Sequence, residues 1–142
     1  MEKNLKIGTD LDGVLATNDL NRADYRPLKM REYYSKCKPT KLSKIPVDVI
    51  ITGRKKCYSK VTIGWLYLNS YLPKKLVMFP VGMKKNNETL CKYKCHCINK
   101  LGLHKYYEDD KRIADYLRAN CPDTEIILVT DEFLQSLESD TK

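Results

Sequence analysis

Residues Ile7–Val14 read IGTDLDGV, an apolar run that ends in two aspartates and a glycine. Side chains two residues apart in a strand point the same way, so Asp10 and Asp12 would face one point where the chain turns. Two carboxylates so close repel one another unless a cation lies between them or one of them holds a proton. The pattern therefore predicts a buried strand that delivers a pair of acids to a site.

The same pattern, Asp-x-Asp-Gly, also fits two other settings. It can form a turn after a strand, in which Gly13 supplies the positive φ. It can open a calcium-binding loop, but the further Asp or Asn positions and the closing Glu of such a loop do not follow here. Taken alone, the pair fits a structural turn as well as a catalytic site, so the rest of the sequence has to distinguish them.

Length and composition indicate a single folded domain over residues 1–142, because 42% of the residues are hydrophobic and the chain is long enough for one core. No apolar run approaches the roughly 20 residues that span a bilayer. The N-terminal residues Glu2, Lys3 and Asn4 are polar where a signal peptide would be apolar. We therefore expect a soluble, cytoplasmic protein with no membrane partner, and the oligomeric state stays open.

The chain has six cysteines, which in a small secreted protein would form disulfides, but nothing here marks secretion and we expect reduced thiols. Cys91, Cys95, His96 and Cys97 raise the question of a zinc site. No second Cys/His pair follows at zinc-finger spacing, and Cys97 would point away from the helix face that Cys91 and Cys95 share. We favour an amphipathic helix that carries thiols, with zinc as the less favoured interpretation.

The formal net charge of +8 favours anionic partners. A small phosphorylated substrate, such as a nucleotide, and a nucleic acid both meet that condition. The lysines are spread along the whole chain, so most of them are expected on a solvated surface. Net charge therefore narrows the class of partner without choosing the substrate.

Short apolar runs alternate with amphipathic stretches along the chain, which predicts an α/β fold: a three-layer, Rossmann-like arrangement with a parallel sheet of about five strands and helices on both faces. In the helix expected over 59–71, Val61, Trp65 and Leu68 would share one face, and Asp131 would cap the last helix. Residues 17–46 interrupt the alternation and are expected to form a small, cap-like insert with one or two short helices. The predicted strands are 5–9, 47–52, 76–79, 106–107 and 126–130, and the predicted helices are 59–71, 87–101, 110–118 and 131–137.

Ligands of open parallel sheets bind at the carboxyl ends of the strands, so the residues after each apolar run are candidates for a site. The residues after each run can also have a purely structural role: Thr52-Gly53 can be an ordinary turn, and Asp109-Asp110 can cap a helix. Their occurrence at successive strand ends, in this order, favours a site. The candidates are Asp10 and Asp12 after the first run, Thr52, Gly53 and Arg54 after the second, and Glu108, Asp109 and Asp110 after the fourth.

With these residues in place, the chain resembles the haloacid dehalogenase-like (HAD) phosphohydrolase superfamily. The first motif of that superfamily, Asp-x-Asp-Gly after an apolar strand, matches residues 10–14, and its second, an apolar strand that ends in Thr or Ser, matches 49–52. Its fourth motif, a strand that ends in paired acids, matches 106–110. The third is a lysine near the start of the preceding helix: Lys94 is our choice, and Lys92 and Lys100 are alternatives. The Thr52-Gly53-Arg54 form is most similar to the 5′(3′)-deoxyribonucleotidase-like branch.

The resemblance implies a role for each residue. Asp10 would attack phosphorus and form an aspartyl-phosphate, while Asp12 would give a proton to the leaving oxygen and then take one from water. Mg²⁺ would be held by Asp10, the backbone carbonyl of Asp12, and Asp109, with Glu108 orienting waters or Lys94 from outside. Catalytic stabilisation of the transferring phosphoryl group would come from Thr52 and Lys94, and substrate binding from Thr52, Gly53, Arg54 and Lys94.

The sequence thus predicts a Mg²⁺-dependent phosphatase that acts on a nucleotide or another small phosphate ester. Because the insert is short, the site could also be open to larger substrates, and removal of 3′-phosphates from nucleic-acid ends is an alternative that the positive charge favours. A non-catalytic nucleic-acid-binding or interaction domain with a HAD-like shell is another alternative. A phospho-receiver domain is disfavoured, since its acids do not begin as Asp-x-Asp-Gly on the first strand.

Overall fold

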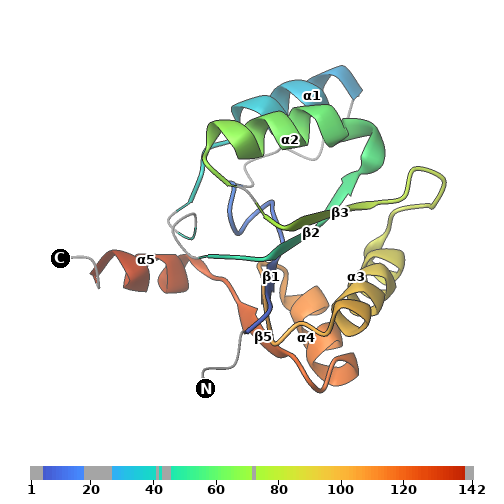
Figure 1. Cartoon of the computed structure of the whole chain (residues 1–142), viewed down its shortest axis with the longest axis vertical. Helices are drawn as coiled ribbons and strands as arrows, with labels where there is room; N and C mark the ends of the chain where they lie inside the picture. Colours follow the sequence, from blue (N-terminus) through green and yellow to red (C-terminus); the bar gives the residue numbers. More distant parts are fainter. Residues whose placement is uncertain (1–4, 18–26, 41, 43–45, 72, 140–142) are drawn as a thin grey trace.

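The structure is a computed structural model that describes residues 5–17, 27–40, 42, 46–71 and 73–139. The fold is α/β and Rossmann-like: five parallel strands form one sheet in the order β3-β2-β1-β4-β5, with helices on both faces (Figure 1). This confirms the fold predicted from the sequence. The strands are β1 (Ile7–Thr9), β2 (Val49–Lys55), β3 (Lys75–Phe79), β4 (Lys105–Glu108) and β5 (Glu125–Leu128), and the helices are α1 (Pro27–Lys36), η3 (Lys56–Tyr58, a 3-10 helix), α2 (Ser59–Leu68), α3 (Asn87–Leu101), α4 (Lys111–Asn120) and α5 (Asp131–Ser139).

Strand β1 lies at the centre of the sheet, where Gly8 pairs with Val49 of β2 on one side and with Tyr106 of β4 on the other. Gly8 has no side chain to displace its neighbours: a Cβ there would lie 2.4 Å from Leu103 Cδ1. The chain leaves β1 for β2 on one side and returns to β4 on the other. The strand order therefore reverses at β1, and the carboxyl end of this strand is where ligands of such sheets bind.

Each face of the sheet is covered by its own apolar cluster. On one face Leu11 and Trp65 of α2 are buried, with the side chain of Phe133 from α5 packed against their cluster. On the other face the cluster is built around Ile98 of α3 and Leu117 of α4, both fully buried. In Figure 1 α3 and α4 lie on the opposite side of the sheet from α1 and α2. Burial of both faces explains why the strands read as continuous apolar runs.

The predicted insert at 17–46 contains α1, which packs alongside α2 (Figure 1). The return segment pairs with the loop after β1, since Thr17 N donates to Lys38 O over 2.8 Å and Thr40 N donates to Leu15 O over 2.8 Å. Much of the insert, residues 18–26, 41 and 43–45, lies outside the described residues. None of the described helices is long and apolar enough to cross a membrane.

Three local predictions were wrong. β2 does not end at Thr52 but runs to Lys55, with a shift in its pairing to β3 between these two residues. Leu68 does not share the buried face of Trp65: it is 82% exposed at the end of α2. The cap of α5 is Thr130 and not Asp131, because the Thr130 hydroxyl accepts a hydrogen bond from Phe133 N over 3.0 Å. Of the three, only the extension of β2 changes the site.

Candidate active site

Asp10 follows β1 directly and is fixed by the backbone around it. Its N–H donates to Tyr107 O of β4 over 2.9 Å, and its carboxylate Oδ1 accepts the N–H of Leu11 over 2.8 Å. The residue is buried, with 7% of its surface exposed. Asp10 therefore lies in the sheet itself, with one carboxylate oxygen held by the backbone and Oδ2 available to other partners.

Gly13 provides the turn that brings the acid pair next to β4. It adopts a φ of 84°, which confirms the positive φ expected there, and a Cβ at this position would lie only 1.9 Å from Asp109 Oδ2. The turn and the site are therefore not competing interpretations of the sequence. The loop needs a glycine both for its backbone conformation and because the Asp109 carboxylate occupies the space of a side chain.

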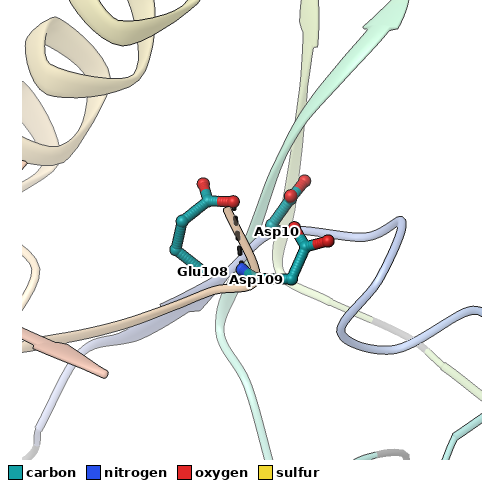
Figure 2. A group of neighbouring side chains, drawn as sticks. All are labelled: Asp10, Glu108 and Asp109. Carbon is teal, nitrogen blue, oxygen red and sulfur yellow. Dashed lines mark hydrogen bonds between the residues drawn. The ribbon is translucent and has the colours of Figure 1, made fainter. Parts of the chain in front are cut away.

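The acids after β4 divide between structure and site. Asp110 caps α4, since its Oδ1 accepts the N–H groups of Arg112 over 2.9 Å and Ile113 over 3.2 Å. Glu108 Oε2 accepts the backbone N–H groups of Asp109 over 3.1 Å and Asp110 over 3.2 Å, which holds the strand end in place. The helix-cap interpretation thus applies to Asp110, while Figure 2 shows the Asp109 carboxylate beside that of Asp10.

An acidic triad forms where β1 and β4 end (Figure 2). One carboxylate oxygen from each of Asp10, Glu108 and Asp109 lies within 4.8 Å of the others, so the group could hold a metal ion. Burial, together with the charges of Glu108 and Asp12 and against the attraction of Lys94, raises the pKa of Asp10 to about 7. Burial and the charge of Asp10 raise the pKa of Asp109 to about 7. A cation at this point would offset the neighbouring negative charge, which adds to the effect of burial in raising both pKa values.

Lys94 projects from the middle of α3 into the triad. Its Nζ lies 2.7 Å from Glu108 Oε1 and 3.2 Å from Asp10 Oδ2, and only 1% of the side chain is exposed. Burial alone would lower the pKa of Lys94, but the neighbouring Asp10, Tyr106 and Glu108 hold it well above its usual value. The other two candidate lysines lie elsewhere: Lys92 pairs with Glu88 at the surface, and Lys100 is exposed. The structure thus brings Lys94, and neither alternative, to Asp10.

Arg54 is turned inward by the irregularity in β2. Its guanidinium donates to both carboxylate oxygens of Asp12, from Nε over 2.9 Å and from Nη2 over 2.7 Å. Its Nη1 donates to the Thr62 hydroxyl over 3.2 Å, and its Cζ lies 3.8 Å from the centre of the Tyr34 ring. Only 1% of the Arg54 surface is exposed, and its guanidinium contacts Asp12 directly. The contact of Arg54 with substrate stays a prediction.

Thr52 and Gly53 are neighbours in β2, but Thr52 is buried whereas Gly53 borders a cavity. The Thr52 side chain is fully buried, and its hydroxyl accepts the N–H of Arg54 over 3.1 Å, as in a turn. Gly53 lines a cavity of about 160 Å³ together with Asp10, Asp12, Lys94 and Asp109. Thr52 is not among the described residues that line this cavity. Because residues predicted to be catalytic line this space, we call it the catalytic pocket; its other lining residues are Tyr33, Tyr34, Lys85, Leu90, Glu108, Asp110 and Ile113.

Lys85 is the charged lining residue that the sequence did not single out. It lies in the loop between β3 and α3, and a Cβ on Gly53 would lie 3.4 Å from its Nζ. Much of the side chain is exposed, but burial of the amine lowers the pKa of Lys85, against the opposing attraction of Asp12 and Asp10. A lysine after the third strand could have been noticed as a strand-end residue, but it stands six residues beyond Phe79 in a loop without periodicity.

The cysteine-rich part of α3 does not contribute to the triad. Cys91 and Cys97 are buried in the cluster beneath the sheet, whereas His96 is exposed. Within the described part of the chain, the group that could hold a metal ion is the acidic one. All six cysteines are free thiols in the structure, and Cys95 Sγ lies 3.5 Å from Cys121 Sγ. Cys91, Cys95 and Cys97 therefore lie on one helix, as expected, and the preference against zinc stays a prediction.

Comparisons with known proteins show a likeness of fold. No model of a protein family matches the chain, and no curated protein matches it. A chain in the structure of the Pnkp1/Rnl/Hen1 RNA repair complex superimposes with a TM-score of 0.69 at 14% identity, over 87% of this chain and 42% of that one. A chain in a second structure, that of the Pnkp1/Rnl/Hen1 complex, gives a TM-score of 0.68 at 14% identity over 90% and 47% of the two chains. This chain thus spans less than half the length of either.

Proposed function

We propose that the protein is a Mg²⁺-dependent phosphatase of the HAD-like superfamily that removes terminal phosphates from nucleic-acid ends. The observation that carries the proposal is the position of Asp10, whose Oδ2 lies 3.2 Å from Lys94 Nζ and whose carboxylate borders that of Asp109. A buried carboxylate beside a fixed ammonium and a group able to hold a metal is suited to attack an electrophile that carries negative charge.

Asp10 acts as the nucleophile in this proposal. Its carboxylate oxygen forms a bond to phosphorus while the bond from phosphorus to the ester oxygen breaks, and the electron pair leaves with that oxygen. Lys94 stabilises the charge of the phosphoryl oxygens, as positioned cations do in phosphoryl transfer. Asp10, Asp109 and the backbone carbonyl of Asp12 would hold Mg²⁺, which when bound offsets negative charge and acts as a Lewis acid.

Asp12 moves the proton. Its carboxyl group gives a proton to the leaving ester oxygen, and its carboxylate then takes a proton from the water that hydrolyses the aspartyl-phosphate. About 22% of the Asp12 side chain is exposed, against 9% of the Asp10 side chain, so Asp12 is the more accessible of the two acids to a water molecule. Arg54 fixes the direction in which the Asp12 carboxyl points, through its two hydrogen bonds.

Two observations support a nucleic-acid substrate over a free small molecule. The net charge of +8 favours a polyanion over a single phosphate ester. The structures that share the fold belong to an RNA repair complex. Neither observation distinguishes a 3′-phosphate from a 5′-phosphate, and of the two we propose the 3′-phosphate.

A non-catalytic nucleic-acid-binding domain is the second candidate. The observation that favours it is the ion pair of Asp12 with Arg54, because a carboxylate held by a guanidinium has to leave this partner, or share it, to carry a proton. The two candidates differ in one measurable respect: both bind a phosphorylated strand, but only the enzyme releases inorganic phosphate.

The experiment measures phosphate release by the purified chain, first freed of metal and then supplied with Mg²⁺. The substrates are a 3′-phosphorylated oligonucleotide, its 5′-phosphorylated counterpart, a nucleoside monophosphate and p-nitrophenyl phosphate. We expect Mg²⁺-dependent release, fastest from the 3′-phosphate, and complete loss in Asp10→Asn. Asp115→Asn is the matched control, since Asp115 is exposed on α4 and pairs with Lys111 away from the catalytic pocket. Binding of the oligonucleotide without phosphate release would instead establish the second candidate.

A further inference from the structure

A second cavity of about 550 Å³ adjoins the catalytic pocket, and we call it the side groove. The two spaces share three lining residues, so a ligand in one can extend into the other. The catalytic pocket, at about 160 Å³, has room for little more than a phosphoryl group and waters, whereas 550 Å³ falls in the range of small-molecule sites. The side groove is lined by Met30, Tyr34, Lys55, Tyr58, Lys85, Asn86, Asn87 and Leu90, of which Tyr34, Lys85 and Leu90 also line the catalytic pocket.

The walls of the side groove have two kinds of chemistry. Part of the lining is apolar and aromatic: the Tyr34 and Tyr58 rings meet edge to face with their centres 5.3 Å apart, and Met30 lines the same groove. The lining also includes the amides of Asn86 and Asn87; Asn86 offers its Nδ2, because its Oδ1 accepts the N–H of Thr89 over 2.9 Å at the start of α3. A planar ring with hydrogen-bonding edges is the ligand that suits both, because aromatic side chains contact its faces and amides bind its edges.

Lys85 stands where the two cavities join. Within the part of the chain that the structure describes, its ammonium forms no ion pair or hydrogen bond. It lies over Gly53, whose missing side chain leaves room for the amine: a Cβ there would be 3.4 Å from Nζ. A cation between a phosphoryl-sized pocket and a groove for a flat ring suits a nucleotide whose terminal phosphate lies in the pocket and whose base lies in the groove.

We propose that the side groove binds the nucleoside that carries the scissile phosphate at the 3′ end of a nucleic-acid strand. Lys85 binds the phosphate at the junction, and the Tyr58 ring contacts the base. The positive charge of Lys55 in the same groove complements the next phosphate of the strand. This inference rests on the proposed function for its substrate class and assigns the groove, Lys85 and Tyr58 to substrate recognition.

The test compares kcat/KM for a 3′-phosphorylated oligonucleotide with kcat/KM for glycerol 2-phosphate, an ester without a ring. In Tyr58→Ala we expect the ratio of the two values to fall about tenfold, the usual loss on removing one base-stacking side chain. Lys85→Gln should lower kcat/KM for both substrates, because both place a phosphate at the junction. The controls are Tyr67→Ala, in which an exposed tyrosine of α2 is removed, and Lys84→Gln, next to Lys85 but outside the groove, and neither should change either value.

Binding separates this inference from the proposed function. The affinity of Asp10→Asn for the same oligonucleotide is measured by fluorescence anisotropy, with and without Tyr58→Ala and Lys85→Gln. Weaker binding in both double variants supports the side groove even if no substrate is hydrolysed, a result that would refute the proposed activity alone. Equal loss of kcat/KM for both substrates in Tyr58→Ala, or unchanged oligonucleotide binding in both double variants, would overturn the assignment of the groove.

Discussion

Arg54 and Asp12 form a two-point ion pair, with Nε 2.9 Å from Oδ2 and Nη2 2.7 Å from Oδ1, although 42 residues separate them in the sequence. The guanidinium has no exposed surface and rests on the Tyr34 ring at 3.8 Å. The pair joins the end of β2 to the loop after β1. The direction of Asp12, the acid that we propose carries the proton, is therefore set by the neighbouring strand and not by its own loop.

Arg54→Lys should lower kcat for phosphate release at least about tenfold with little change in KM, because an ammonium cannot make two parallel hydrogen bonds to Asp12. The variant keeps the positive charge, so a loss reports orientation and not charge. Steady-state kinetics on the 3′-phosphorylated oligonucleotide measure it, and thermal unfolding checks that the variant is folded. A kcat equal to that of the unchanged protein would show that Arg54 does not position Asp12.

Asp10→Asn and Asp12→Asn should fail at different steps. Without the Asp10 nucleophile no phosphorylated protein forms from any substrate. Without the Asp12 proton carrier, p-nitrophenyl phosphate, whose leaving group needs no proton, should still phosphorylate Asp10, and the aspartyl-phosphate should accumulate because its hydrolysis lacks a base. Mass spectrometry after an acid quench detects the added phosphoryl group. A quenched Asp12→Asn sample without phosphorylated Asp10 would contradict these roles.

Metal binding should strengthen as the pH rises through about 7, where the pKa values of Asp10 and Asp109 lie in the metal-free protein. A metal ion binds the carboxylate and competes with the proton, so the apparent Mg²⁺ affinity should rise up to about tenfold per pH unit for each proton displaced. Calorimetric titrations with Mg²⁺ at pH 6 and pH 8 measure the change. Equal affinities at the two pH values would mean that neither acid is a ligand.

The same shifts give the metal-free protein a distinct pH dependence of stability. Both acids have a higher pKa in the folded than in the unfolded protein, so the folded state binds more protons between the ordinary aspartate pKa of 3.8 and about 7. Their contribution to stability is complete below that window and is lost as the pH rises through it. The melting temperature should fall over this range, the decline should flatten in Asp109→Asn, and Mg²⁺ should reverse it at pH 8. If neither Asp109→Asn nor Mg²⁺ alters the fall in melting temperature, titratable groups other than Asp10 and Asp109 cause it.

Gly13→Ala should disrupt metal binding, whereas Gly102→Ala should only reduce stability. Both glycines have a positive φ, 84° and 64°, which costs an alanine about 1–2 kcal/mol. A Cβ at Gly13 would also lie 1.9 Å from Asp109 Oδ2, while a Cβ at Gly102 meets nothing within 4 Å. Comparing the two by unfolding and by Mg²⁺ titration separates backbone strain from displacement of Asp109. Wild-type Mg²⁺ affinity in Gly13→Ala would show that Asp109 does not need its present position.

The fold could be predicted because helices cover both faces of the sheet, so that most of each strand appears as an apolar run. The position of Asp10 beside Asp109 followed from the same logic, since parallel strands end at one edge. The direction of Arg54 could not be predicted, because it depends on the shift in pairing between β2 and β3 at Thr52–Lys55, which leaves no pattern in the sequence. Lys85 was missed for a related reason: its position is set by the close approach of a loop to Gly53.

The charges at the carboxyl end of the sheet indicate which ionic form of substrate the site accepts. Apart from Asp110, whose carboxylate caps α4, the carboxylates of Asp10, Asp12, Glu108 and Asp109 face two cations, Lys94 and Arg54, which leaves these six groups with a formal charge of −2 when all are ionised. One divalent cation makes the group neutral. A phosphate dianion then brings the net charge back to −2. The ammonium of Lys85 and a proton on Asp12 would together return it to zero. In the phosphatase that we propose, electroneutrality would tie substrate entry to protonation of Asp12, so a phosphodiester, with one charge fewer, would enter without loading the proton that its cleavage requires.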